Sequence, residues 1–139
     1  MLTKSEKLQK YLKKTDFEVF TFQRINSLDV FKHTENVDGI PIQSFIAIGE
    51  NPATEITYIL GNCTDALKHE RLVFFMNELN VQRKLKFCID DKGLITASFH
   101  YYADDDNFNA DALISLYVVF FESLIKEGDI RKIMKIIWS

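Results

Sequence analysis

Apolar and polar residues alternate along most of residues 17–60, and this period of two restricts the fold more than any other feature. In a β-strand, every second side chain lies on the same face. Turn residues divide the stretch into segments that we predict as strands, at residues 17–25, 29–34, 40–48 and 54–60. Asp38-Gly39 and Asn51-Pro52 are typical of short turns, so successive strands should pair antiparallel.

The third of these strands has the clearest alternation. One face carries Ile40, Ile42, Ser44, Ile46 and Ile48. The other face carries Pro41, Gln43, Phe45 and Ala47. We therefore expect the isoleucine face to pack against the interior of the protein, since antiparallel sheets commonly bury one face.

Outside this stretch the spacing of apolar residues is helical, apart from one hairpin. We predict a first helix within residues 1–14, a second that starts near Asn62 or Thr64 and ends at Asn80, and a third from about 108 to 126. A short helical turn follows at residues 130–138. Between the second and third helices, residues 84–90 and 94–102 alternate on either side of Asp91-Lys92-Gly93 and predict a β-hairpin.

The predicted order is helix, three or four strands, helix, two strands, helix. This order is typical of an α+β fold, an antiparallel sheet with helices packed on it, rather than of a parallel βαβ fold. A chain of 139 residues with 47% hydrophobic residues is long enough for one core and too short for two of ordinary size. We therefore expect residues 1–139 to form a single domain.

Charge and composition exclude several classes of function. The formal net charge of −3 has the wrong sign for a protein that neutralises nucleic-acid phosphates. The longest mostly apolar run, residues 112–121, is about half as long as a membrane span. The lysine-rich start lacks the apolar segment of a signal peptide, so we expect a cytoplasmic protein. Cys63 and Cys88 should then be free thiols.

No residues have the spacing of a catalytic, metal or cofactor site. The histidines lie in separate predicted elements, no serine lies in a Gly-x-Ser-x-Gly motif, and every glycine is isolated. His100 precedes an acidic run, residues 104–106, whose carboxylates should stabilise the start of the third helix. We therefore expect no enzymatic activity, no metal and no cofactor. The alternative is a small-molecule sensor or a small enzyme with a pocket near His100 and Asp104.

The predicted third helix is apolar on all sides. Packing on a sheet would bury one stripe, formed by Leu113, Leu116, Tyr117, Phe120 and Leu124. A second stripe remains, formed by Ile114, Val118, Phe121 and Ile125. We expect this second stripe to be an interface in a homodimer, because two identical chains commonly cover such a patch. The alternative is that the first helix or residues 130–138 cover it within one chain.

Residues 67–123 contain a more specific pattern. A helix ends in Met76-Asn77-Glu78-Leu79-Asn80, and a strand at 84–90, the turn Asp91-Lys92-Gly93, a strand that ends at Tyr102 and a long apolar helix follow it. In these features the chain resembles the YbjN family of small bacterial proteins, whose fold looks like that of type III secretion chaperones. The family's usual acidic run near the end of the third helix is replaced by basic residues, Lys126, Arg131 and Lys132. The resemblance implies a regulatory or chaperone-like binding protein with no catalytic residues.

Together these observations predict a non-enzymatic protein-binding module, a chaperone-like or regulatory adaptor of the YbjN type. The lack of a catalytic constellation and the excess of apolar surface on the third helix both favour binding over catalysis. We expect a homodimer that binds a protein client, whose identity the sequence does not give. An immunity-type inhibitor of a toxin is a further alternative.

Overall fold

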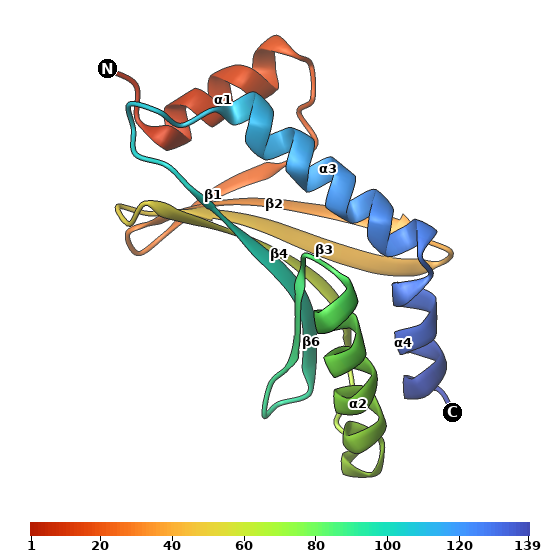
Figure 1. Cartoon of the computed structure of the whole chain (residues 1–139). Helices are drawn as coiled ribbons and strands as arrows, with labels where there is room; N and C mark the ends of the chain where they lie inside the picture. Colours follow the sequence, from red (N-terminus) through yellow and green to blue (C-terminus); the bar gives the residue numbers. More distant parts are fainter.

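The structure is a computed structural model that describes residues 1–139 as four helices and six strands (Figure 1). In chain order the elements are α1 (Lys4–Lys14), β1 (Thr21–Ile25), β2 (Leu28–Val37), β3 (Ile40–Ile48), β4 (Ala53–Asn62), α2 (Ala66–Gln82), β5 (Lys86–Ile89), β6 (Leu94–Tyr102), α3 (Ala110–Lys126) and α4 (Asp129–Ile137).

All six strands belong to one antiparallel sheet with the order β1-β2-β3-β4-β6-β5. The prediction of an α+β fold is therefore confirmed. β3 has the predicted bounds, and β5 pairs with β6 as the predicted hairpin. Asp38 and Gly39, which join β2 to β3, have φ angles of 53° and 83°, and a type I′ turn requires positive φ at both central residues.

Gly93 fastens the β5–β6 hairpin to the end of β4. Its φ is 87°, and a Cβ atom at this position would lie 2.1 Å from the carbonyl oxygen of Cys63. The backbone N–H of Cys63 donates a hydrogen bond to the carbonyl oxygen of Gly93 at 2.8 Å. Only glycine fits this close approach of two backbone segments without displacing them.

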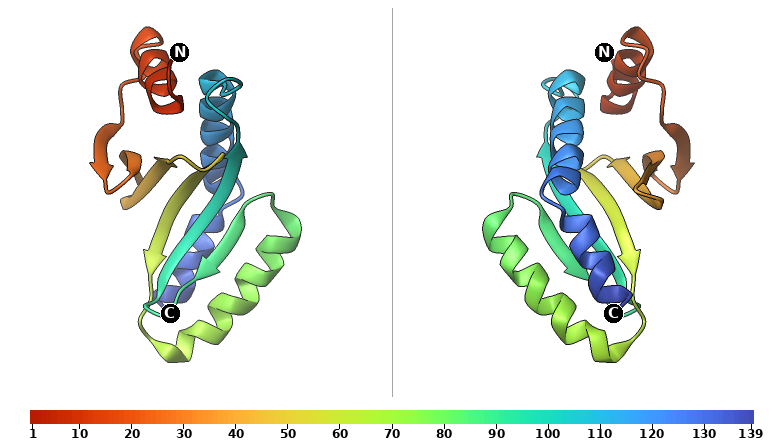
Figure 2. Two further views of the ribbon diagram at one scale, coloured as in Figure 1. Left: turned by 90° about the vertical axis from the view of Figure 1, so that its left-hand side faces the viewer. Right: turned by 90° about the vertical axis from the view of Figure 1, so that its right-hand side faces the viewer.

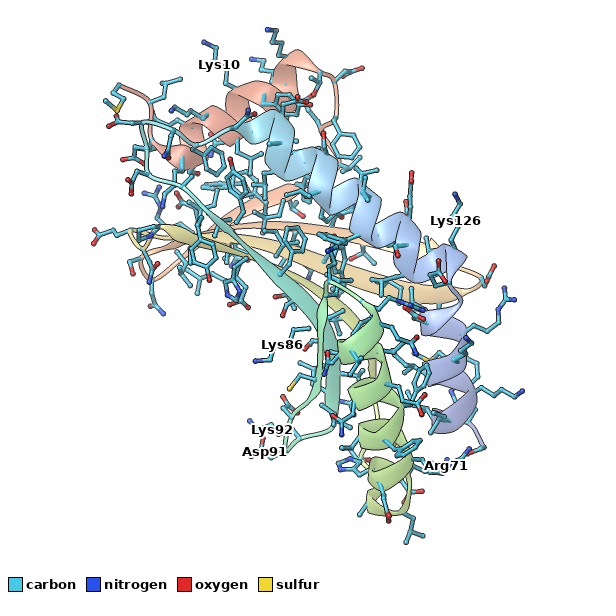
Figure 3. The ribbon with its side chains drawn as sticks, viewed as in Figure 1. Lys10, Arg71, Lys86, Asp91, Lys92 and Lys126 are labelled. Atoms are coloured by element: carbon cyan, nitrogen blue, oxygen red, sulfur yellow. The ribbon has the colours of Figure 1, made fainter.

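The two faces of the sheet have different surroundings. α1, α3 and α4 lie on one face, α2 lies against β5 and α4, and no helix crosses the opposite face (Figure 1, Figure 2). The covered face carries the fully buried side chains of the central strands, among them Ile42, Ile46, Ile56, Tyr58 and Ile95. The side chains of the open face lie in solvent. Figure 3 shows one of them, Lys86 of β5, which points away from the helices.

A buried chain of hydroxyl groups connects α3 to the middle of the sheet. The hydroxyl groups of Ser44 and Tyr117 are 2.6 Å apart, and the hydroxyl of Tyr58 donates to the backbone carbonyl of Tyr117 at 2.6 Å. All three side chains are buried. Because an unpaired buried hydroxyl costs about 1–3 kcal/mol, these bonds strongly favour one position of α3 on the sheet.

The outer edge of β5 is closed by a side chain. The Asn80 side chain donates from Nδ2 to the carbonyl oxygen of Phe87 at 3.0 Å, and its Oδ1 accepts from the N–H of Phe87 at 2.6 Å. The carboxamide thus occupies the place that a further strand would take. Asn80 is the last residue of the predicted second helix, which extends two residues further in the structure.

The acidic run at 104–106 stabilises a different helix from the one predicted. Asp105 accepts from the backbone N–H of Lys4 at 3.1 Å, and the Lys7 ammonium group donates to the carbonyl oxygen of Asp105. The start of α3 is capped instead by Asn109, whose Oδ1 accepts from the N–H of Ala112 at 3.0 Å. The predicted pairing of the run with the third helix is wrong, because in three dimensions the run lies beside the first turn of α1.

Several predicted boundaries also change, among them the end of β2, which is at Val37 instead of Thr34. β1 starts at Thr21 instead of Phe17, because the chain after α1 turns at Asp16, with φ at 56°, and the aromatic rings that follow pack inwards. The ring centroids of Phe17 and Phe20 are 6.1 Å apart, and Phe20 lies 5.3 Å from Tyr117. α2 is capped by Asp65, one residue after the predicted Thr64.

The buried tyrosines predict how stability depends on alkaline pH. Burial raises the pKa of Tyr117 to about 12 from an ordinary value of 10, and it raises the pKa of Tyr58 as well. The unfolded chain therefore loses these protons before the folded chain does, so stability is full below pH 10 and declines as the pH rises towards 12. The slope is at most about 1.4 kcal/mol per pH unit for each tyrosine.

Urea denaturation between pH 8 and 12 measures this decline. Tyr117→Phe should make it shallower, because the variant has one buried phenol fewer to ionise. Tyr102→Phe is the matched control, since Tyr102 is exposed on the open face and its loss should leave the slope unchanged. An equal slope in wild type and Tyr117→Phe would contradict the prediction.

A buried ion pair holds α2 to the start of α4. The guanidinium of Arg83 donates from Nε and Nη2 to the two carboxylate oxygens of Asp129, at 3.0 and 3.1 Å. The Asp129 side chain is only 1% exposed. Gly128, which precedes it with φ at 73°, allows the chain to turn sharply between α3 and α4. This pair therefore fixes where α4 lies.

Asp129→Ala should lower the free energy of unfolding by about 1–3 kcal/mol, because the partly buried Arg83 loses two hydrogen bonds and keeps only Glu127, whose carboxylate lies 3.7 Å away. The exposed pair between Arg131 and Asp38 provides the control, and Arg131→Ala, which removes the pair from the helical side, should leave stability nearly unchanged. Guanidinium denaturation of both variants measures the difference. Equal effects of the two substitutions would show that burial does not determine the strength of these pairs.

Candidate binding groove

α3 is rotated on the sheet relative to the prediction. The residues that it buries are Ala110, Leu113, Ile114, Tyr117, Phe121 and Leu124. Leu116, which was predicted to be buried, is 38% exposed, and Phe120 is half-buried with its ring 4.7 Å from that of Phe99. The expected interface is therefore wrong for Ile114 and Phe121, because both belong to the core of the single chain. Val118 and Ile125 remain partly exposed.

A groove lies beside these two exposed residues, where α3, α4 and the β2–β3 turn meet. It has a volume of about 620 Å³, within the range of known ligand sites. Its wall is mainly apolar and consists of Val37, Ile40, Ile125, Ile130, Met134 and Trp138, with polar or charged groups from Asp38, Arg131, Lys135 and Ser139. We call this the α4 groove. Ile125 is the predicted site residue that lines it.

A second, smaller hollow lies along α3. It has a volume of about 160 Å³ and is lined by His33, Glu35, Tyr117, Val118, Phe121, Glu122 and Ile125. Ile125 lines both hollows, so they are neighbours on the surface. Three of the four predicted interface residues thus line these two hollows, which together we call the depression, and only Ile114 does not.

The two ends of the depression carry opposite charge. Arg131 and Lys135 lie at the α4 end, whereas Glu35 and Glu122 lie at the other. Arg131 is already paired with Asp38 at 2.7 Å, so Lys135 is the cation there without an ion pair. Neither Glu35 nor Glu122 is paired with a lysine or an arginine, so both carboxylates can bind a cation there. The depression therefore distinguishes the two directions in which a chain segment can lie.

His100 and Asp104 do not share a cavity. His100 lies on β6 with its Nε2 3.5 Å from Glu55 of β4, and both side chains are substantially exposed. Asp104 lines a different, polar hollow of about 660 Å³ beside α1, which His100 does not reach. No group of three or more metal-ligating side chains is found in the structure. The structure therefore contains no pocket shared by His100 and Asp104 of the kind considered from the sequence.

The α4 groove depends on residues that no sequence motif identifies. Trp138 and Met134 come from the final helical turn, while Val37 and Ile40 flank the Asp38–Gly39 turn almost a hundred residues earlier. The amphipathic pattern of residues 130–138 predicted a helix. It did not indicate that this helix would form the groove together with the β2–β3 turn.

Comparisons with known proteins add no relative. No family model matches the chain, and no curated protein matches it. No helix has the length and apolar character needed to cross a bilayer. The site must therefore be interpreted from its own geometry.

The rotation of α3 is itself testable. Phe121→Ala should destabilise the protein by about 3–5 kcal/mol, because its ring is buried against Tyr58 and Tyr117. Leu116→Ala should cost much less, although the sequence placed Leu116 in the core and Phe121 outside it. Thermal and urea denaturation compare the two variants, and a larger effect of Leu116→Ala would contradict the rotation seen here.

Proposed function

We propose that the protein is a non-enzymatic binding module that holds an extended segment of a partner protein in the α4 groove. The observation that carries this proposal is the concave apolar surface of about 620 Å³ formed by α3, α4 and the β2–β3 turn. A pocket of this size with a few charged groups at its rim is the usual form of a binding site.

The shape of the depression favours a peptide over a compact small molecule. Ile125 lines both the α4 groove and the hollow at Val118, so an occupant that fills both must be elongated. An extended chain places alternate side chains on one side, and such side chains would contact the apolar wall in succession. Backbone groups on the other side of the segment would stay in water.

The charges at the two ends favour one direction of binding. Lys135 at the α4 end would pair with an acidic side chain of the segment, and Glu122 at the other end with a basic one. Exposed ion pairs contribute little affinity, but they select partners and orientation. We therefore propose a segment with apolar residues between one acidic and one basic residue.

The resemblance to YbjN proteins supports the same class of function, since that family consists of regulatory or chaperone-like binding proteins. The six-stranded sheet with helices on one face agrees with the general α+β order of that resemblance. Chaperone-like activity remains part of the proposal, with the α4 groove as the place of contact.

Site-specific photocrosslinking tests the proposal. A benzoylphenylalanine at Ile125, inside the groove, should capture one partner in the cells that make this protein, whereas the same probe at Val119 should not. Both positions are partly exposed aliphatic residues of α3, at 41% and 57%, but Val119 lies outside the groove. Mass spectrometry of the crosslink identifies the captured segment, which can then be synthesised as a peptide.

The peptide should shift the fluorescence of Trp138, the only tryptophan in the chain, to shorter wavelengths, because a bound apolar segment removes water from the exposed indole. Ile125→Glu should weaken the peptide by about tenfold or more, since loss of apolar contact costs at least about 1.4 kcal/mol. Val119→Glu is the matched control and should bind normally. Equal affinity of wild type and Ile125→Glu would refute the groove as the binding site.

A further inference from the structure

β1 is the open edge of the sheet. The sheet has two edge strands, β1 and β5, and the Asn80 side chain already occupies the outer backbone groups of β5. All five residues of β1 are exposed. Figure 2 shows β1 at the margin of the molecule, with no element beyond it.

The pairing of β1 with β2 shows which backbone groups of β1 point outwards. Asn26 and Ser27 form the turn of this hairpin, so Ile25 and Leu28 are its closing pair. The closing pair of a two-residue turn is hydrogen-bonded, so the backbone groups of Ile25, Gln23 and Thr21 bond to β2. The N–H and C=O groups of the residues between them, Phe22 and Arg24, therefore point away from β2. None of the hydrogen bonds outside the ladders reaches these groups.

The β1–β2 hairpin and the segment just before it also expose apolar side chains. Val19, Phe22, Ile25 and Leu28 are each between 43% and 45% exposed. Exposed apolar side chains next to unpaired strand groups are the combination that pairs readily with another strand. The single ion pair here, between Arg24 and Asp29 at 2.6 Å, neutralises the charge that would otherwise repel an identical edge.

We propose that β1 pairs antiparallel with β1 of a second copy of this chain, across a two-fold axis at Gln23. In this register Phe22 of one copy lies opposite Arg24 of the other, and these two residues exchange their outward hydrogen bonds. Thr21 lies opposite Ile25, so all five residues of the strand take part. An edge that is its own complement in this way is what a closed dimer requires.

Other two-fold registers fit the strand less well. An axis at Arg24 would bring the two Arg24 side chains directly opposite each other. An axis at Phe22 would require Phe20 to pair, but Phe20 lies outside β1 and packs against Tyr117. The axis at Gln23 instead places the Phe22 ring beside a guanidinium that Asp29 already orients, a favourable cation–π arrangement.

The register predicts a specific disulfide. Across the axis the two Gln23 residues form a non-hydrogen-bonded pair, with Cα atoms about 4.5 Å apart, which suits a disulfide bond. Gln23→Cys, in a Cys88→Ser background that removes the exposed native thiol, should crosslink nearly completely on mild oxidation. Thr21→Cys is the matched control on the same face, and its two copies would lie about 13 Å apart, too far for a disulfide.

Light scattering provides the second measurement. Wild type at tens of micromolar should have about twice the mass of the 16.2 kDa chain. Arg24→Pro should be monomeric, because proline removes an outward N–H without breaking the β1–β2 ladder, whereas Arg24→Thr keeps that N–H and should remain a dimer. Both variants lose the ion pair with Asp29, so this loss cannot explain a difference between them. Circular dichroism checks that both fold.

Several results would overturn the proposal. One is a monomeric wild type whose Gln23→Cys variant does not crosslink, which would leave the edge free for a strand of a different protein. Another is equal crosslinking of Thr21→Cys and Gln23→Cys, which would indicate collision instead of a fixed register. A folded Arg24→Pro variant that stays dimeric would also exclude β1 as the interface.

Discussion

The hydrogen bonds of Tyr117 with β3 and β4 determine how the covered face of the sheet is arranged. α3 is apolar on nearly all sides, so hydrophobic burial alone would accept several rotations of the helix. The Tyr117 hydroxyl, however, must find a partner once it is buried, and Ser44 supplies it at the centre of β3. Tyr58 then binds the carbonyl oxygen of the same residue. Two directional hydrogen bonds therefore select one rotation of α3, which the amount of buried apolar surface alone would not do.

That rotation also creates the candidate groove. With Tyr117 directed at the sheet, Phe121 follows it into the core, and Val118 and Ile125 face the side of β2. Leu116 and Val119 then point to solvent. The ion pair between Arg83 and Asp129 places α4 at the end of α3, so its residues Met134 and Trp138 form the opposite wall.

Local pattern was sufficient for β3 and for the β5–β6 hairpin. In β3 the isoleucines of one face repeat without interruption, so a slip by one residue would expose them all, and the bounds were predicted correctly. The rotation of α3 could not be read in this way, because apolar residues surround the helix and only the distant partners Ser44 and Tyr58 distinguish its sides. Similarly, residues 104–106 are close to α3 in sequence, and nothing local indicates that they meet α1.

The α4 groove was only partly foreseeable. Val118, Phe121 and Ile125 were singled out as apolar residues in excess, but three of the ten residues that line the groove, Val37, Asp38 and Ile40, come from the β2–β3 turn. Contacts between segments so far apart in the chain depend on the complete sheet. Excess hydrophobicity therefore pointed to a helix beside the candidate groove, and not to the shape of the groove.

The groove and the open edge lie at opposite ends of β2, which bears on how the two would work together. Val37 at the end of β2 lines the groove, whereas β1 pairs with residues at its start, Leu28 to Lys32. At about 3.3 Å per residue, ten residues of β2 separate these ends by roughly 30 Å. A dimer joined through β1 would leave both grooves open at its far ends. Two linked sites bind a partner with two suitable segments more tightly than one site does, provided that the partner can span both sites. Self-association through β1 would therefore increase the avidity of the α4 grooves without altering either groove.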